Sequence, residues 1–73
     1  MTRLIFTFET VFQVLSADKV LRDKINCRTV PTPSGLSSSI CGISIELLDH
    51  SQETQALSQL EANELNPKGV FRI

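Results

Sequence analysis

Short segments of regular hydrophobic spacing follow one another along this 73-residue chain, and their order limits the folds open to it. Residues 3–8 alternate with period two, which indicates a strand with one more deeply buried face. Thr10 followed by Gln13 matches a capping box, and apolar residues at helical spacing then predict a helix over 11–24. The stripe expected to face the core contains Val11, Val14, Leu15, Leu21 and Ile25.

The middle of the chain indicates two further strands. Residues 25–30 are rich in β-branched side chains and end at Pro31, which cannot donate to a ladder and so closes a second strand. Residues 40–48 alternate between apolar and polar side chains, which predicts a third strand with one face of each kind. The apolar face contains Ile43, Ile45 and Leu47.

The last third of the chain predicts a helix and a short strand. Asp49 or Ser51 can cap the helix, which is expected to run to about Glu64. Its buried stripe should contain Ala56, Leu57, Leu60 and Leu65. Residues 66–69 have proline and glycine at the positions typical of a type I turn, and residues 70–73 are short and β-like.

This order predicts the fold class. Strand, helix, strand, strand, helix, strand is typical of the α+β ferredoxin-like βαββαβ plait, an antiparallel four-stranded sheet with both helices on one face. The third strand is then expected between the first and the second. A chain of 73 residues has room for one small core, so we expect a single domain over 1–73 without a deep substrate cavity.

The stretch from Pro31 to Gly42 reads P-T-P-S-G-L-S-S-S-I-C-G, and packing alone does not explain its composition. Its prolines restrict the backbone, hydroxyl-bearing side chains follow, and Gly42 comes directly after Cys41. An open, rigid, donor-rich corner suits a reactive thiol, so Cys41 is the candidate for chemistry. The alternative is that Cys41 packs as a small hydrophobic residue at a strand start.

In the plait, the start of the third strand lies near the beginning of the first helix. Because unpaired N–H groups at a helix N-terminus favour an anion, they could stabilise the thiolate of Cys41. The candidate ligands for this thiolate or a bound oxyanion are Ser38, Ser39, Gly42 and Thr10. The alternative is that the Ser/Thr cluster forms only a solvated loop.

Two other candidates for chemistry are less favoured. A hairpin centred near Gly35 would pair Cys27 closer to Ile43 than to Cys41, which leaves the two cysteines too far apart for a disulfide. His50 is expected at the opposite end of the third strand from Cys41, so a Cys–His pair is not expected.

The side of the sheet without helices is expected to carry charge. We expect Arg28, Glu46 and Arg72 there, paired across strands or exposed to solvent. If Ile5, Val30 and Val70 join them, that face could pack in a homodimer.

Composition excludes several functions. Seven basic and eight acidic residues give a net charge of −1, so no field of a single sign would attract nucleic acid or an anionic membrane. No apolar run approaches the roughly 20 residues that span a bilayer, and the amino terminus has no apolar signal core, so we expect a cytoplasmic protein. The two cysteines and one histidine lack zinc or thioredoxin-like spacing, so neither a metal nor a cofactor is expected.

The pattern P-T-P-x-x-L-S-S-x-x-C-G, with Ala-Asp-Lys at 17–19 before it and V-F-R-I at 70–73 after it, resembles the small selenium/sulfur (Se/S) carrier-like family over nearly the whole chain. The resemblance implies that Cys41 carries sulfur or selenium as a persulfide or selenide. It also implies the motif positions Pro31, Pro33, Ser38, Ser39, Cys41 and Gly42. The family often has a basic residue after the second proline, where this chain has Ser34, so an anion-handling role is not carried over to that position.

The sequence thus predicts a carrier or accessory protein that is not an enzyme. Cys41 would accept sulfur or selenium from a donor protein and pass it to an acceptor protein. One alternative is a regulatory or interaction module that binds an anionic ligand at the Pro/Ser-rich loop, with Cys41 structural. Another is a purely structural interaction domain that uses its sheet face.

Overall fold

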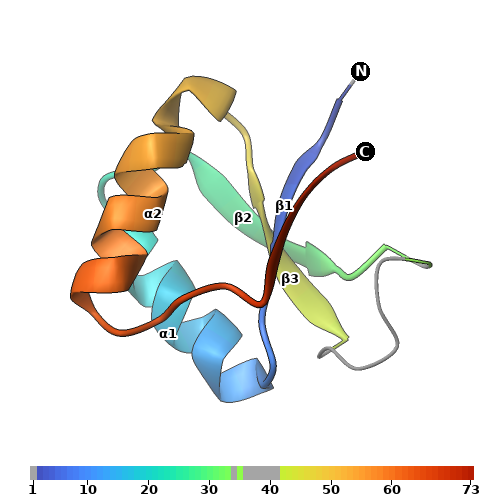
Figure 1. The fold of residues 1–73 in the computed structure, drawn as a ribbon, viewed down its shortest axis with the longest axis horizontal. Helices are drawn as coiled ribbons and strands as arrows, with labels where there is room; N and C mark the ends of the chain where they lie inside the picture. The colour runs from blue at the N-terminus through green and yellow to red at the C-terminus, as the bar shows by residue number, and fades with distance from the viewer. Residues whose placement is uncertain (1, 34, 36–41) are drawn as a thin grey trace.

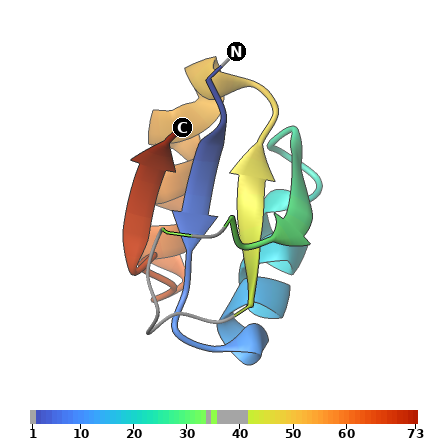
Figure 2. The same ribbon diagram turned by 90° about the vertical axis from the view of Figure 1, so that its right-hand side faces the viewer.

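The computed structural model describes residues 2–33, 35 and 42–73, which form one antiparallel sheet and a layer of helices (Figures 1 and 2). The elements in chain order are β1 (Leu4–Thr7), α1 (Val11–Leu21), β2 (Cys27–Pro31), β3 (Ile43–Leu47), the 3₁₀ turn η1 (His50–Gln52), α2 (Glu53–Ala62) and β4 (Gly69–Arg72). The strand order is β2-β3-β1-β4, and each neighbouring pair is antiparallel. Both helices cover the same face, and Figure 2 looks onto the other face.

This arrangement confirms the predicted α+β class and is consistent with a ferredoxin-like plait. β3 lies between β1 and β2, as predicted. The core fills the space between the sheet and the helices. Its fully buried members include Leu4, Phe6, Phe8, Val14, Ala17, Leu21, Ile45, Leu47, Ala56 and Leu60.

Helix α1 begins where the capping signal predicts. Thr10 has extended backbone, and its side-chain oxygen accepts a hydrogen bond from the backbone N–H of Gln13 at 3.1 Å. The side chain of Gln13 returns to accept from the backbone N–H of Glu9, one residue before the cap, at 3.1 Å. These contacts satisfy two backbone donors at the start of the helix.

The predicted end and inner face of α1 are corrected. The helix ends at Leu21 instead of Lys24, because the N–H of Lys24 closes a tighter turn onto the carbonyl of Leu21. Of the expected stripe, Val14, Leu21 and Ile25 are buried, whereas Val11 and Leu15 are exposed. Ala17 is buried in their place. Helix α1 has more apolar residues than its contact with the sheet can cover. The angle at which α1 packs on the sheet therefore decides which of them are buried.

The boundaries of the other elements also shift. β2 begins at Cys27, two residues later than predicted, and extends through Pro31, which pairs with Ile43. β3 covers Ile43–Leu47, so the predicted strand over 40–48 was too long by Gly42 and Leu48; residues 40 and 41 lie outside the described residues. Asp49 caps η1 by accepting from the N–H of Ser51 at 3.0 Å, and α2 follows as far as Ala62, short of Glu64. Glu64 has a φ of 58°, in the left-handed region that ends helices.

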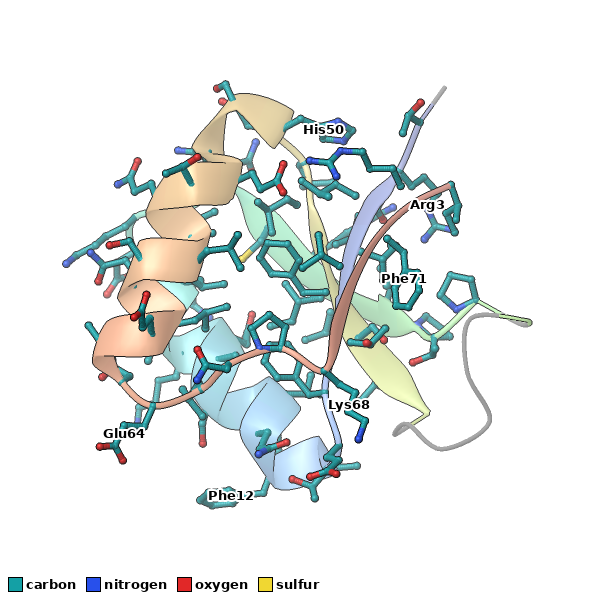
Figure 3. All side chains as sticks on the ribbon, viewed as in Figure 1. Arg3, Phe12, His50, Glu64, Lys68 and Phe71 are labelled. Atoms are coloured by element: carbon teal, nitrogen blue, oxygen red, sulfur yellow. The ribbon has the colours of Figure 1, made fainter. Side chains whose placement is uncertain are left out.

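The facing of β4 differs from the prediction. Its pairs with β1 are Leu4↔Arg72, Ile5↔Phe71, Phe6↔Val70 and Thr7↔Gly69. Val70 and Arg72 therefore face the helices, and Arg72 forms an ion pair with Glu53 of α2. Phe71 lies on the side of the sheet away from the helices (Figure 3). The expectation that Arg72 and Val70 lie on the helix-free face is wrong, because pairing with β1, which lies far away in sequence, sets the facing of so short a strand.

Candidate functional site

The base of the Pro31–Gly42 loop is described on both sides. Pro31 pairs with Ile43, and the backbone N–H of Thr32 donates to the carbonyl of Gly42 at 2.9 Å, which continues the ladder past a proline that has no N–H. Pro33 follows and is half-buried. The predicted site residues Cys41, Ser38 and Ser39 lie outside the described residues.

Gly42 is the described neighbour of Cys41. Its backbone is not in the left-handed region, since Gly35 is the glycine for which a positive φ is found, at 89°. A Cβ atom built on Gly42 would meet nothing within 4 Å, and the residue is exposed. Neither backbone conformation nor packing within the described chain therefore requires glycine at this position.

The first turn of α1 lies at the same end of the sheet as Gly42, as predicted, because β1 and β3 are antiparallel (Figure 1). A cation that the sequence did not predict also lies here: Lys68 donates to Glu9 at 3.2 Å, and its backbone N–H donates to the carbonyl of Thr7. Glu9 is exposed and paired with Lys68, which offsets its charge near the helix N-terminus. Only the tertiary pairing of β4 with β1 brings Lys68 to this end.

The Thr10 oxygen is already engaged as the helix cap, although its O–H remains a donor. Thr10→Ala should lower the free energy of unfolding by about 1 kcal/mol, because it leaves the N–H of Gln13 without this acceptor. Thr10→Ser keeps the oxygen and should lose less than half as much. Urea titrations of the three proteins measure this difference, and equal losses for both variants would contradict the capping role.

The other thiol, Cys27, is unsuited to nucleophilic chemistry. It is the first residue of β2 and pairs with Leu47, at the opposite end of the hairpin from the pair of Pro31 with Ile43. The expected proximity of Cys27 to Ile43 is therefore wrong, although the conclusion that Cys27 lies away from the loop stands. Burial raises the pKa of its thiol above the ordinary value, so little thiolate forms at neutral pH.

His50 lies at the end of the molecule opposite Lys68 (Figure 3). It follows β3, at the far end of that strand from Gly42, whereas Cys41, the residue from which it was predicted to be distant, lies outside the described residues. Near His50, on the face away from the helices, Glu46 is only 6% exposed and accepts from both Arg28 and Arg3. The predicted cross-strand pair of Arg28 with Glu46 is confirmed, whereas Arg3 was not predicted. Because residues two apart in an extended chain point to the same side, the position of Arg3 two residues before Ile5 could have placed it on this face.

Other kinds of site are absent from the described part of the chain. No group of three or more His, Cys, Asp or Glu side chains there could hold a metal ion. None of the helices found within the described residues combines the length and apolar character needed to cross a bilayer.

Together these features define a small α+β fold in which Gly42, the residue that follows Cys41 in the sequence, is exposed at one end of the sheet. A family model described as "Putative Se/S carrier protein-like" matches residues 3–72. The chain belongs to this family, as the sequence resemblance indicated. Comparisons with curated proteins and with solved structures find no match.

Proposed function

We propose that this protein is a carrier of sulfur or selenium that holds the atom on Cys41 and exchanges it with partner proteins. The family match over residues 3–72 is the observation that carries this proposal. The protein acts as a carrier in the cytoplasm and not as an enzyme, and its partners are a donor and an acceptor of the atom.

The transfer is a thiolate exchange without net oxidation. The Cys41 thiolate attacks the outer sulfur of a persulfide on the donor; a new S–S bond forms on Cys41, the donor's S–S bond breaks, and the donor leaves as a thiolate. Transfer to the acceptor repeats the step in the other direction. A selenium atom would move by the same exchange.

Two features of the described residues support this role. No described residue packs where a side chain at Gly42 would lie, and a bare backbone beside a thiol would let another protein's sulfur approach. Cys27 is the other cysteine, and its raised pKa and packing against the core make it the poorer nucleophile. The N–H groups at the start of α1 and the hydroxyls of Ser38, Ser39 and Thr10 would favour an anionic sulfur.

Intact-protein mass spectrometry after incubation with a cysteine desulfurase and cysteine tests the proposal. The wild type and Cys27→Ser should gain a reducible adduct of ~32 Da, and Cys41→Ser should gain none. Gly42→Val should still fold, because a Cβ there would meet no described residue within 4 Å, but should load more slowly. A wild type without an adduct, or an adduct that needs Cys27 and not Cys41, would refute the carrier.

The same variants distinguish the carrier from the alternative, a module whose Pro/Ser-rich loop binds a small anion and in which Cys41 only packs. That module would lose stability in Cys41→Ser and would form no adduct. The pH dependence of alkylation by iodoacetamide adds a second readout. For a carrier thiolate, the pH at which the rate is half-maximal should lie below the ~8.5 of an ordinary cysteine. Whether the protein is a carrier or an anion-binding module, a homodimer through the helix-free face would raise its molar mass in solution as the protein concentration increases.

A further inference from the structure

A depression on the described surface lies away from the loop, over the ends of β1, β2 and β3. It is an open groove of about 820 Å³, and Arg3 and His50 mark the end of the molecule at which it lies (Figure 3). Its lining comprises Thr2, Arg3, Asn26, Arg28, Glu46, Leu47, Leu48, Asp49 and His50. The two arginines and the histidine make it rich in hydrogen-bond donors.

The arginines converge on one carboxylate at the floor of this groove. Arg3 donates through Nε to Oε2 of Glu46 at 3.1 Å and through Nη2 to Oε1 at 3.2 Å. Arg28 donates to the same Oε1 through Nε at 3.2 Å and Nη2 at 3.0 Å. One buried carboxylate therefore holds two guanidinium groups, and the trio keeps one positive charge that Glu46 does not compensate.

Donors are left over on both guanidinium groups. The bonds to Glu46 use Nε and Nη2 of each arginine, which leaves each Nη1 without an acceptor among the described residues. The side chains of Arg3 and Arg28 are 43% and 60% exposed, so these donors can reach a ligand from solvent. Glu46 also fixes both side chains in advance, which lowers the entropic cost of binding.

We propose that this groove binds an oxyanion of the phosphate type between Arg3 and Arg28. Planar guanidinium groups recognise such oxyanions through paired N–H donors, and fixed forks do so better than mobile lysines. Asp49 also lines the groove and opposes an anion at its own end, although its Oδ1 is occupied by Ser51. Binding should therefore centre on the arginines, with a Kd on the order of 1 mM for a free ion.

The oxyanion can be a free ion or the end of a larger molecule. The groove is much larger than one phosphate, which favours a phosphate monoester whose organic part rests against the exposed side chain of Leu48. Titrations with inorganic phosphate and with a sugar phosphate distinguish these sources. Tighter binding of the ester assigns the site to a monoester, and equal binding assigns it to the free ion.

Amide chemical-shift titrations at low ionic strength test the site. The wild type should show saturable shifts that cluster at Asn26, Arg28 and His50. Arg28→Ala should bind at least about tenfold more weakly, because it removes a charged donor, and Arg28→Lys should recover only part of the affinity. Arg72→Ala is the matched control, because Arg72 is also paired with a carboxylate, Glu53, but lies outside the groove.

A change of opposite sign makes the test stricter. Glu46→Gln removes a negative charge beneath the arginines and also loosens the contacts that fix them. For an anion bound directly above the carboxylate the loss of charge repulsion should outweigh the lost fixation, so phosphate binding should tighten several-fold, whereas a purely structural ion pair predicts no binding in any variant. The proposal is overturned if no saturable shift appears in the wild type, or if Arg28→Ala binds as the wild type does. Cys41→Ser should leave phosphate binding unchanged, so this site and the carrier thiol can fail independently.

Discussion

Phe6→Ala should lower the free energy of unfolding by about 3–5 kcal/mol, the largest effect expected of a single core substitution here. Phe6 is fully buried at the centre of β1, between Ile45 of β3 and Val70 of β4, and its ring packs in the core beneath the helices. Removing it leaves a cavity in a core that so short a chain cannot easily refill. A domain of this length is stabilised by roughly 4–11 kcal/mol in total, so the variant should be close to unfolding.

Phe12→Ala is the matched control, because it deletes the same ring from a side chain that is 77% exposed. Its effect should stay within about 0.5 kcal/mol. Urea titrations followed by circular dichroism measure both variants. A loss for Phe12→Ala as large as that for Phe6→Ala would mean that the outer face of α1 is covered in solution, for instance by a second copy of the chain.

Glu46→Gln should lower the free energy of unfolding by about 1–2 kcal/mol at neutral pH. The buried carboxylate accepts charged hydrogen bonds from Arg3 and Arg28, and the amide can replace neither the charge nor both acceptors. The loss stays below that for a fully buried ion pair, because both arginines can turn to water when the carboxylate is gone.

The pH dependence identifies this contribution. Hydrogen bonds from Arg3, and secondly from Arg28, hold the pKa of Glu46 below the ordinary value of 4.5. Its stabilisation is therefore fully present above pH 4.5 and is lost as the pH falls through the lower pKa of the folded protein. The stability of Glu46→Gln should fall less steeply over that range. Glu61→Gln, an exposed change on α2, should keep the wild-type slope, and parallel profiles for Glu46→Gln and wild type would contradict the assignment.

The candidate thiol could be proposed from sequence because its signals are local. Two prolines, a run of serines and a Cys-Gly pair stand next to one another, and the family match covers them. The cap at Thr10 was likewise readable, since a capping box lies within one turn of helix. The sequence predicted the pair of Arg28 with Glu46 but not the groove, because Arg3, just before β1, meets residues of β2 and β3 only when the sheet forms.

The errors in the fold have the same origin. The inner face of α1 was assigned from helical spacing, but Val11, Val14, Leu15 and Ala17 all allow a plausible stripe, and only contact with the sheet decides that Ala17 is buried and Leu15 exposed. Both helices end earlier than predicted. A turn such as the one at Lys24 costs little free energy and does not interrupt the hydrophobic spacing from which helix length is predicted.

The order of strands and helices, and with it the α+β class, follows from the sequence alone, because periods of two and 3.6 residues are properties of neighbouring positions. The candidate carrier thiol, Cys41, and its glycine neighbour are also proposed from the sequence alone. Only the tertiary structure decides that Arg72 faces α2, that Lys68 joins Glu9, and that one buried Glu46 gathers two arginines. These outcomes depend on the register between strands that are far apart in the sequence. The whole sheet and its core fix that register, so it cannot be derived from any single segment.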